Sequence, residues 1–177
     1  MEKANYGNKH KTLPKYISKE EISSILDKAK KDRYRNYILL LTLWRTGMRV
    51  SEIVKFRKKQ IQDNSIIVRG SKSGDRVIPL ESELGNLLGL FTDRMNSRDK
   101  VFPLSERQVR NIVYKYSENG TVHPHTFRHS FAVYCLKNGM NLRTLQKILG
   151  HTSLTTTQIY LDIVGKDVKD DFEKVVW

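Results

Sequence analysis

Side chains that can handle a phosphate group occur in one order along this chain: Arg49, Lys72, His125, Arg128, His151 and Tyr160. A guanidinium is always charged and can bind two oxygens of a phosphodiester through a bidentate fork. A tyrosine hydroxyl can attack phosphorus, while histidines and a lysine can transfer protons. Together these residue types predict covalent cleavage and rejoining of a nucleic-acid backbone, rather than passive binding.

The composition also favours a nucleic-acid partner. The 177 residues include 32 Lys and Arg against 19 Asp and Glu, which gives a formal net charge of +13. A chain of this length can form one domain with a true core, and so basic a domain is typical of proteins that bind a phosphate backbone. The alternative is a soluble basic protein without such a partner. The basic residues do not gather on one long amphipathic helix, which argues against a membrane surface as partner.

Cysteine usage and hydropathy indicate the compartment. The single cysteine, Cys135, excludes an internal disulfide and favours a reducing environment, so we expect a cytoplasmic protein. Cys135 lies among aromatic and aliphatic residues and is expected to be an inert core thiol. The stretch from Met1 to Lys11 lacks the apolar region of a signal peptide, and the longest apolar run, Tyr37 to Trp44, is too short to span a bilayer.

The elements that must position the phosphate-handling side chains are mostly helices. Apolar residues recur with helical spacing over residues 22–29, 37–44, 84–91, 109–116 and 142–149. A further helix is expected from about Thr126 to Leu136. Two β-branched runs, Ser65–Val68 and Arg76–Pro79, flank a polar segment and predict a hairpin. The predicted fold class is therefore mainly α with a small antiparallel β-sheet (α+β).

Arg49 and Lys72 occupy positions from which they could reach a phosphate. Arg49 follows Gly47, which is expected to end the preceding helix, and it opens a short helix whose amide donors and dipole favour an anion. Its alternative role is an ion pair with a surface carboxylate such as Glu52. Lys72 lies at the tip of the predicted hairpin, where a lysine is otherwise simply solvated.

His125 and Arg128 are three residues apart, a spacing that places both side chains on one face of a helix. One alternative is a zinc site, because His125 and His129 are four apart like two ligands of a zinc peptidase. That motif requires a glutamate directly after the first histidine, and Thr126 stands there instead. The sequence therefore predicts no metal site.

Tyr160 is singled out among eight tyrosines by its context. It follows His151 by nine residues and is preceded by a run of threonines. A phenol is largely protonated at neutral pH, so it needs cationic neighbours or a base to act as a nucleophile. The alternative is an ordinary core or surface tyrosine.

In these features the chain resembles the catalytic domain of tyrosine recombinases of the phage-integrase and Xer type. The strings that carry the resemblance are Thr46 to Glu52, Ser71 to Gly74, His123 to His129, Leu149 to His151 and Thr155 to Tyr160. In that order they are similar to the box of the first catalytic arginine, the lysine of a β-hairpin, the His-x-x-Arg box, the last histidine and the nucleophile. The resemblance extends from about Leu13 to Ile163.

The resemblance implies the tyrosine-recombinase catalytic-domain fold and a reaction on double-stranded DNA. Tyr160 would attack a DNA phosphodiester and form a 3′-phosphotyrosyl bond. The other implied roles are stabilisation of phosphoryl charge by Arg49 and Arg128, acid catalysis by Lys72, assistance to the tyrosine proton by His125 and a phosphate hydrogen bond from His151. Neither a metal, a cofactor nor ATP is implied. Two alternatives stay open: a nicking-closing enzyme of the topoisomerase IB type, and a DNA-binding module with weak or lost activity.

The resemblance also suggests how the chain is organised. Residues 1–12 resemble the family's interdomain linker, residues 13–177 form the expected catalytic domain, and the family's additional N-terminal DNA-binding domain is expected to be absent. Val168, Phe172, Val175 and Val176 fall on one stripe and predict a tail helix over residues 166–177. Such a tail could pack on its own domain or on a neighbouring protomer. We expect a monomer in solution and a tetramer on DNA.

Overall fold

The computed structural model describes residues 14–70, 74–120, 122–151, 153 and 155–164, and all structural statements below concern those residues. The predicted linker-like segment 1–12, the hairpin tip with Lys72 and the predicted tail helix lie outside them. Within the described residues, no helix combines the length and the apolar character needed to cross a bilayer.

Helices dominate the fold, as predicted. In chain order they are α1 (Lys19–Asp32), α2 (Tyr34–Thr46), α3 (Val50–Ile53), α4 (Ser82–Thr92), α5 (Glu106–Tyr116), α6 (Pro124–Lys137), α7 (Leu142–Leu149) and α8 (Thr155–Val164). Two short 3-10 turns, η1 (Lys58–Gln60) and η2 (Glu118–Gly120), complete the helical elements.

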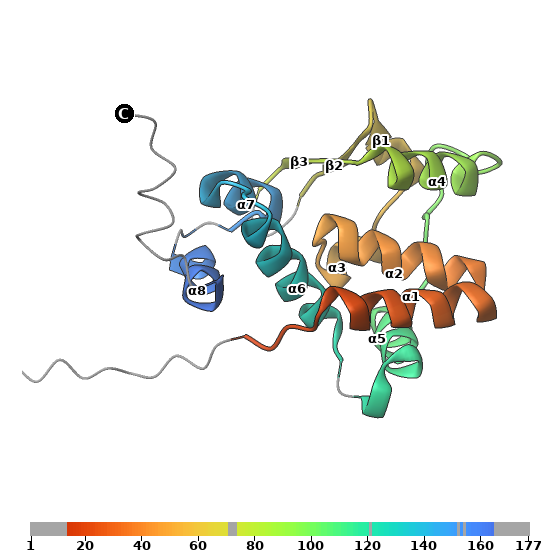
Figure 1. Ribbon diagram of the computed structural model, residues 1–177. Helices are drawn as coiled ribbons and strands as arrows, with labels where there is room; N and C mark the ends of the chain where they lie inside the picture. The colour runs from red at the N-terminus through yellow and green to blue at the C-terminus, as the bar shows by residue number, and fades with distance from the viewer. Residues whose placement is uncertain (1–13, 71–73, 121, 152, 154, 165–177) are drawn as a thin grey trace, which may run out of the picture.

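The core is built around α2. Its residues from Asn36 to Trp44 are all buried, which is the pattern of a helix enclosed on every side. The helices α1, α4 and α6 pack against it, and α6 in turn contacts α7 and α8 (Figure 1). The cysteine, Cys135 on α6, is buried in this core as expected, and burial raises the pKa of its thiol to about 12.

Local sequence signals fix where the helices begin and end. Ser18 caps α1 by accepting a hydrogen bond from the backbone N–H of Glu21. The helix α6 starts at Pro124, two residues earlier than predicted, because proline suits the first turn and the Thr126 hydroxyl accepts the backbone N–H of His123. Gly150 ends α7 in the left-handed conformation (φ 65°), which glycine adopts without a steric penalty.

The sheet has three antiparallel strands in the order β1 (Ile61–Gln62), β2 (Ser65–Val68) and β3 (Arg76–Pro79). The β2–β3 pairing confirms the predicted hairpin, and its register places Val68 opposite Arg76. The strand β1 was not predicted, because two residues are too short to show an alternating pattern. Alternation along β3 turns Arg76 and Ile78 inward and leaves Val77 exposed. A charged residue at an inward position is unusual, and it proves central to the site.

Candidate active site

Arg49, Arg128 and His151, three of the predicted residues, come together around the C-terminal end of α7. Three arginines from different elements donate to the last carbonyl oxygens of that helix: Arg76 to Ile148, Arg128 to Leu149 and Arg49 to Gly150, with donor–acceptor distances of 2.7, 2.6 and 3.3 Å. These carbonyls have no partner within the helix and carry the negative end of its dipole. The arginines therefore fix the turn that leads into His151.

Among the predicted site residues that the structure describes, Arg128 is the most deeply buried after Tyr160, with 4% of its surface exposed. Besides Leu149, it donates to the carbonyl of Gly47 at 2.6 Å. Burial, and next the charge of Arg49, lower the pKa of Arg128 to about 10, so the guanidinium stays charged at neutral pH. Gly47 itself is left-handed (φ 60°), and a Cβ there would come within 2.6 Å of the ring of Phe131.

A buried carboxylate, Glu52, joins Arg49 to Arg76. Arg76 binds it through a bidentate fork with distances of 2.8 and 2.7 Å, and Arg49 reaches it at 3.1 Å through Nη1 and at 2.8 Å through its backbone N–H. Burial alone would raise the pKa of Glu52, but the hydrogen bond from Arg76 and the contacts with Arg49 outweigh it, so the pKa is lowered. Glu52 is therefore a fixed anion between two cations.

The alternative role considered for Arg49, an ion pair with Glu52, thus exists in the structure, although Glu52 is buried and not a surface group. It does not withdraw Arg49 from the site, because 29% of the Arg49 side chain remains exposed. Arg76 was predicted only as a strand residue. The signal that could have identified it is its place at an inward position of β3, where the alternation calls for an apolar side chain.

His125 and Arg128 differ in exposure although they share a helix. His125 is exposed and lines a cavity, whereas Arg128 lies beneath it in the core. Partial burial, and next the charges of Arg128 and Arg49, lower the pKa of His125. At neutral pH the imidazole is therefore uncharged beside two permanent cations.

The structure pairs the Tyr160 hydroxyl with a histidine that the resemblance does not name. His125 is the implied helper of the tyrosine proton, and Nδ1 of His151, the histidine nearest to Tyr160 in the sequence, lies 2.9 Å from the Thr157 hydroxyl. The Tyr160 hydroxyl instead lies 2.8 Å from Nδ1 of His129, which sequence reasoning had considered only as a zinc ligand. Tyr160 is 1% exposed, and burial raises its pKa. The predicted nucleophile therefore lies protonated beneath the surface, within electrostatic reach of Arg128.

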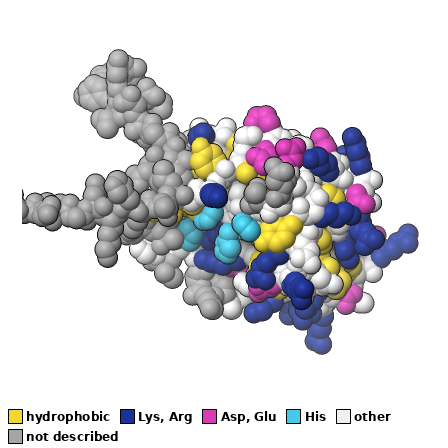
Figure 2. Space-filling view, turned by 90° about the horizontal axis from the view of Figure 1, so that it is seen from below, with side chains coloured by type: hydrophobic (Ala, Val, Ile, Leu, Met, Phe, Trp, Pro, Cys, Tyr) yellow, Lys and Arg dark blue, Asp and Glu magenta, His cyan; other side chains and the backbone are white. Residues whose placement is uncertain are grey.

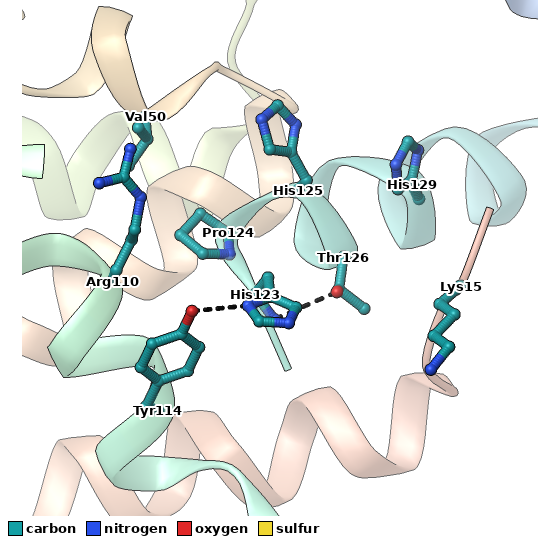
Figure 3. Close-up of a pocket in the computed structure, with 9 residues that line it drawn as sticks. All are labelled: Lys15, Val50, Arg110, Tyr114, His123, Pro124, His125, Thr126 and His129. Carbon is teal, nitrogen blue, oxygen red and sulfur yellow. Dashed lines mark hydrogen bonds between the residues drawn. The ribbon is translucent and has the colours of Figure 1, made fainter. Parts of the chain in front are cut away.

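A cavity of about 420 Å³ opens beside this cluster (Figure 3). The described residues that line it are Lys15, Val50, Arg110, Tyr114, His123, Pro124, His125, Thr126 and His129. In Figure 3 the Tyr114 hydroxyl meets Nδ1 of His123, at 2.7 Å. Figure 2 shows the histidines gathered on one face of the molecule, next to Lys and Arg side chains. This face therefore combines imidazoles with cations.

Lys72, the remaining predicted site residue, lies outside the described residues, so its proposed role stays a prediction. Among the residues that the structure describes, no group of three or more His, Cys, Asp or Glu side chains could hold a metal ion.

Known proteins are similar to this chain in sequence and in fold. The phage integrase family profile matches residues 15–165. The tyrosine recombinase XerA of Pyrococcus furiosus is 36% identical over 182 residues, which cover 93% of this chain and 63% of that protein. This chain thus spans somewhat less than two thirds of that relative's length.

Solved structures agree. The crystal structure of XerA recombinase superposes with a TM-score of 0.75 at 28% identity, covering 94% of this chain and 68% of that one. The Tn1549 transposon integrase, solved in complex with transposon right end DNA, shares the fold with a TM-score of 0.72 at 22% identity, covering 92% of this chain and 65% of that one. The mainly helical architecture with a small antiparallel sheet is that of a tyrosine-recombinase catalytic domain. The chain belongs to the phage integrase family.

Proposed function

We propose that this chain is the catalytic domain of a site-specific DNA recombinase that cuts and rejoins strands through a 3′-phosphotyrosyl intermediate. The observation that supports it most directly is the gathering of Arg49, Arg128 and His151 around one helix end, with Tyr160 in electrostatic reach of Arg128. These residues come from segments up to about a hundred positions apart, and Arg49 and Gly150 are separated by 101. A purely structural arginine cluster would not need a phenol beside it.

The chemistry of the step follows from these groups. The Tyr160 oxygen forms a bond to phosphorus while the bond from phosphorus to the 5′-oxygen breaks, so the backbone energy is retained in the new ester. The phenolic proton leaves to a nearby base, and the 5′-oxygen takes a proton from an acid, the role proposed for Lys72. Arg49 and Arg128 stabilise the charge that develops on the non-bridging oxygens, and His151 donates a further hydrogen bond.

Duplex DNA is the proposed partner. The net charge of +13 favours a polyanion, and the Tn1549 integrase with the same fold was solved on DNA. Figure 2 shows Lys and Arg side chains spread across the face that carries the histidines. The recombinase name of the XerA relative favours strand exchange over a topoisomerase reaction.

A covalent trap tests the activity. The substrate is a pool of nicked duplexes with randomised cores. Cleavage releases a short fragment that diffuses away, and without this fragment the strand cannot be religated. The native chain should form an adduct that resists denaturing gel conditions, and Tyr160→Phe should abolish it. Tyr134→Phe, a partly buried tyrosine on α6, is the matched control and should retain the adduct. An adduct that survives in Tyr160→Phe would refute the assigned nucleophile. Relaxation of supercoiled plasmid without recombinant product would favour the topoisomerase alternative.

We also propose that four copies assemble on DNA while the free chain is monomeric. Exchange between two duplexes breaks four strands, and each chain offers one proposed nucleophile, so four sites are required. The predicted tail helix is the candidate link between copies. Sedimentation of the chain with a trapped duplex should show a tetramer that is lost when residues 168–177 are deleted, and an unchanged assembly would refute this role.

In cells, a fluorescent fusion should be cytoplasmic and coincide with the nucleoid.

A further inference from the structure

His129 stands between the buried Tyr160 hydroxyl and the open cavity. Its ring lies on α6, one turn after His125 and next to Arg128, and the two histidine ring centres are 6.3 Å apart. His129 lines the cavity, while Tyr160 is not among the described residues that line it. Figure 3 shows His125 and His129 rising from the same helix at the cavity wall. His129 therefore touches both the cavity and the Tyr160 hydroxyl.

The charge states of this pair define the direction of its hydrogen bond. Burial, followed by the charges of His125 and Arg128, lowers the pKa of His129 to about 4, so the ring is neutral at pH 7 and one ring nitrogen can accept. Burial raises the pKa of Tyr160, so its hydroxyl keeps its proton and can donate. The 2.8 Å contact between Tyr160 Oη and His129 Nδ1 then joins a phenol donor to an imidazole acceptor.

We propose that His129 is a positioning residue, whose Nδ1 accepts a hydrogen bond from the Tyr160 hydroxyl and holds the nucleophile beside Arg128 before a phosphodiester arrives. This inference rests on the proposed function, and it places on His129 the contact that sequence reasoning assigned to His125. Burial is the main reason that the pKa of His129 is low, and the charge of Arg128 lowers it further. An anionic phosphate bound by Arg128 offsets that charge, so His129 becomes a better acceptor as the substrate binds.

Three substitutions separate this role from simple packing. His129→Leu keeps a side chain of moderate size but removes the acceptor. His129→Asn places a carbonyl oxygen on Cγ, where Nδ1 is attached in histidine, and so retains an acceptor at that point. His125→Leu removes the neighbouring imidazole, and it should leave the Tyr160 hydroxyl contact in place.

The first readout needs no DNA. Tyrosine labelled with ¹³C at Cζ reports on the phenol oxygen, and the Tyr160 resonance is identified by its loss in Tyr160→Phe. His129→Leu should shift this resonance, while His129→Asn and His125→Leu should leave it close to the native position. A Tyr160 resonance that is identical in the native chain and in His129→Leu would overturn the proposal.

The second readout is the single-turnover rate of adduct formation on the nicked duplex pool. His129→Leu should lower the rate about 10- to 100-fold, the size expected when a reacting group is misplaced. His129→Asn should stay within about threefold of native, and DNA affinity should change little in both, because neither variant removes a cation. Equal loss of rate in His129→Leu and His129→Asn, with both folded, would indicate a merely structural role and refute ours. A native chain that forms no adduct would refute the proposed function, while the resonance experiment still decides the His129 contact.

Discussion

Replacing Arg76 with leucine should strongly destabilise the domain, because Arg76 is one half of a buried ion pair. The side chains of Arg76 and Glu52 are 6% and 7% exposed, and the substitution removes their fork as well as the hydrogen bond to Ile148. Breaking a buried pair by deleting one partner costs about 3–5 kcal/mol, since the remaining charge stays in the core. Glu52 keeps two contacts with Arg49, so we expect the lower end, about 3 kcal/mol of unfolding free energy.

Urea unfolding followed by the fluorescence of the buried Trp44 measures this loss, and the double variant with Glu52→Leu tests its cause. If the cost comes from an unpaired carboxylate, removing Glu52 as well should recover about 2 kcal/mol of it. Arg110→Leu is the matched control, because its ion pair with Glu106 is exposed, and it should cost less than about 1 kcal/mol. A loss below about 1 kcal/mol in Arg76→Leu, or strict additivity in the double variant, would refute the reasoning.

Three further outcomes are expected. The pKa values of His129 and His151 are lowered from 6.5 to about 4, so the unfolded chain takes up protons first as the pH falls. The unfolding free energy should therefore be highest above pH 6.5 and should drop by roughly 1–2 kcal/mol per histidine towards pH 4. A urea midpoint that stays constant across this pH range would contradict the prediction. Gly47→Ala should lower the melting temperature by several degrees, because φ is +60° and the new Cβ would lie 2.6 Å from Phe131, so unchanged melting would contradict the left-handed turn. Cys135 should resist a disulfide reagent in the native chain and react only on unfolding, because burial raises the pKa of its thiol to about 12; rapid labelling of the folded chain would show that the thiol is accessible.

The sequence alone determined the features that depend on neighbouring residues. Helical spacing placed α1, α2, α4, α5 and α7, and the β-branched runs placed the β2–β3 hairpin. An ion pair between Arg49 and Glu52 was an alternative that the sequence left open, and the two residues are three apart across the start of a short helix. Each of these depends on backbone geometry within a few residues, which a pattern in the chain reports directly.

Only the tertiary structure decided which distant groups meet. The Arg76 fork spans 24 residues to Glu52, and the His129–Tyr160 contact spans 31. Spacing puts His125 and His129 on one helix face, but the docking of α8 against α6 determines which imidazole meets the phenol. The burial of Tyr160 is likewise a tertiary feature, because the sequence left open whether this tyrosine lies in the core or at the surface. Residue types and their order thus predicted the chemistry, while packing decided which side chains meet, because contacts between elements depend on how whole faces fit together.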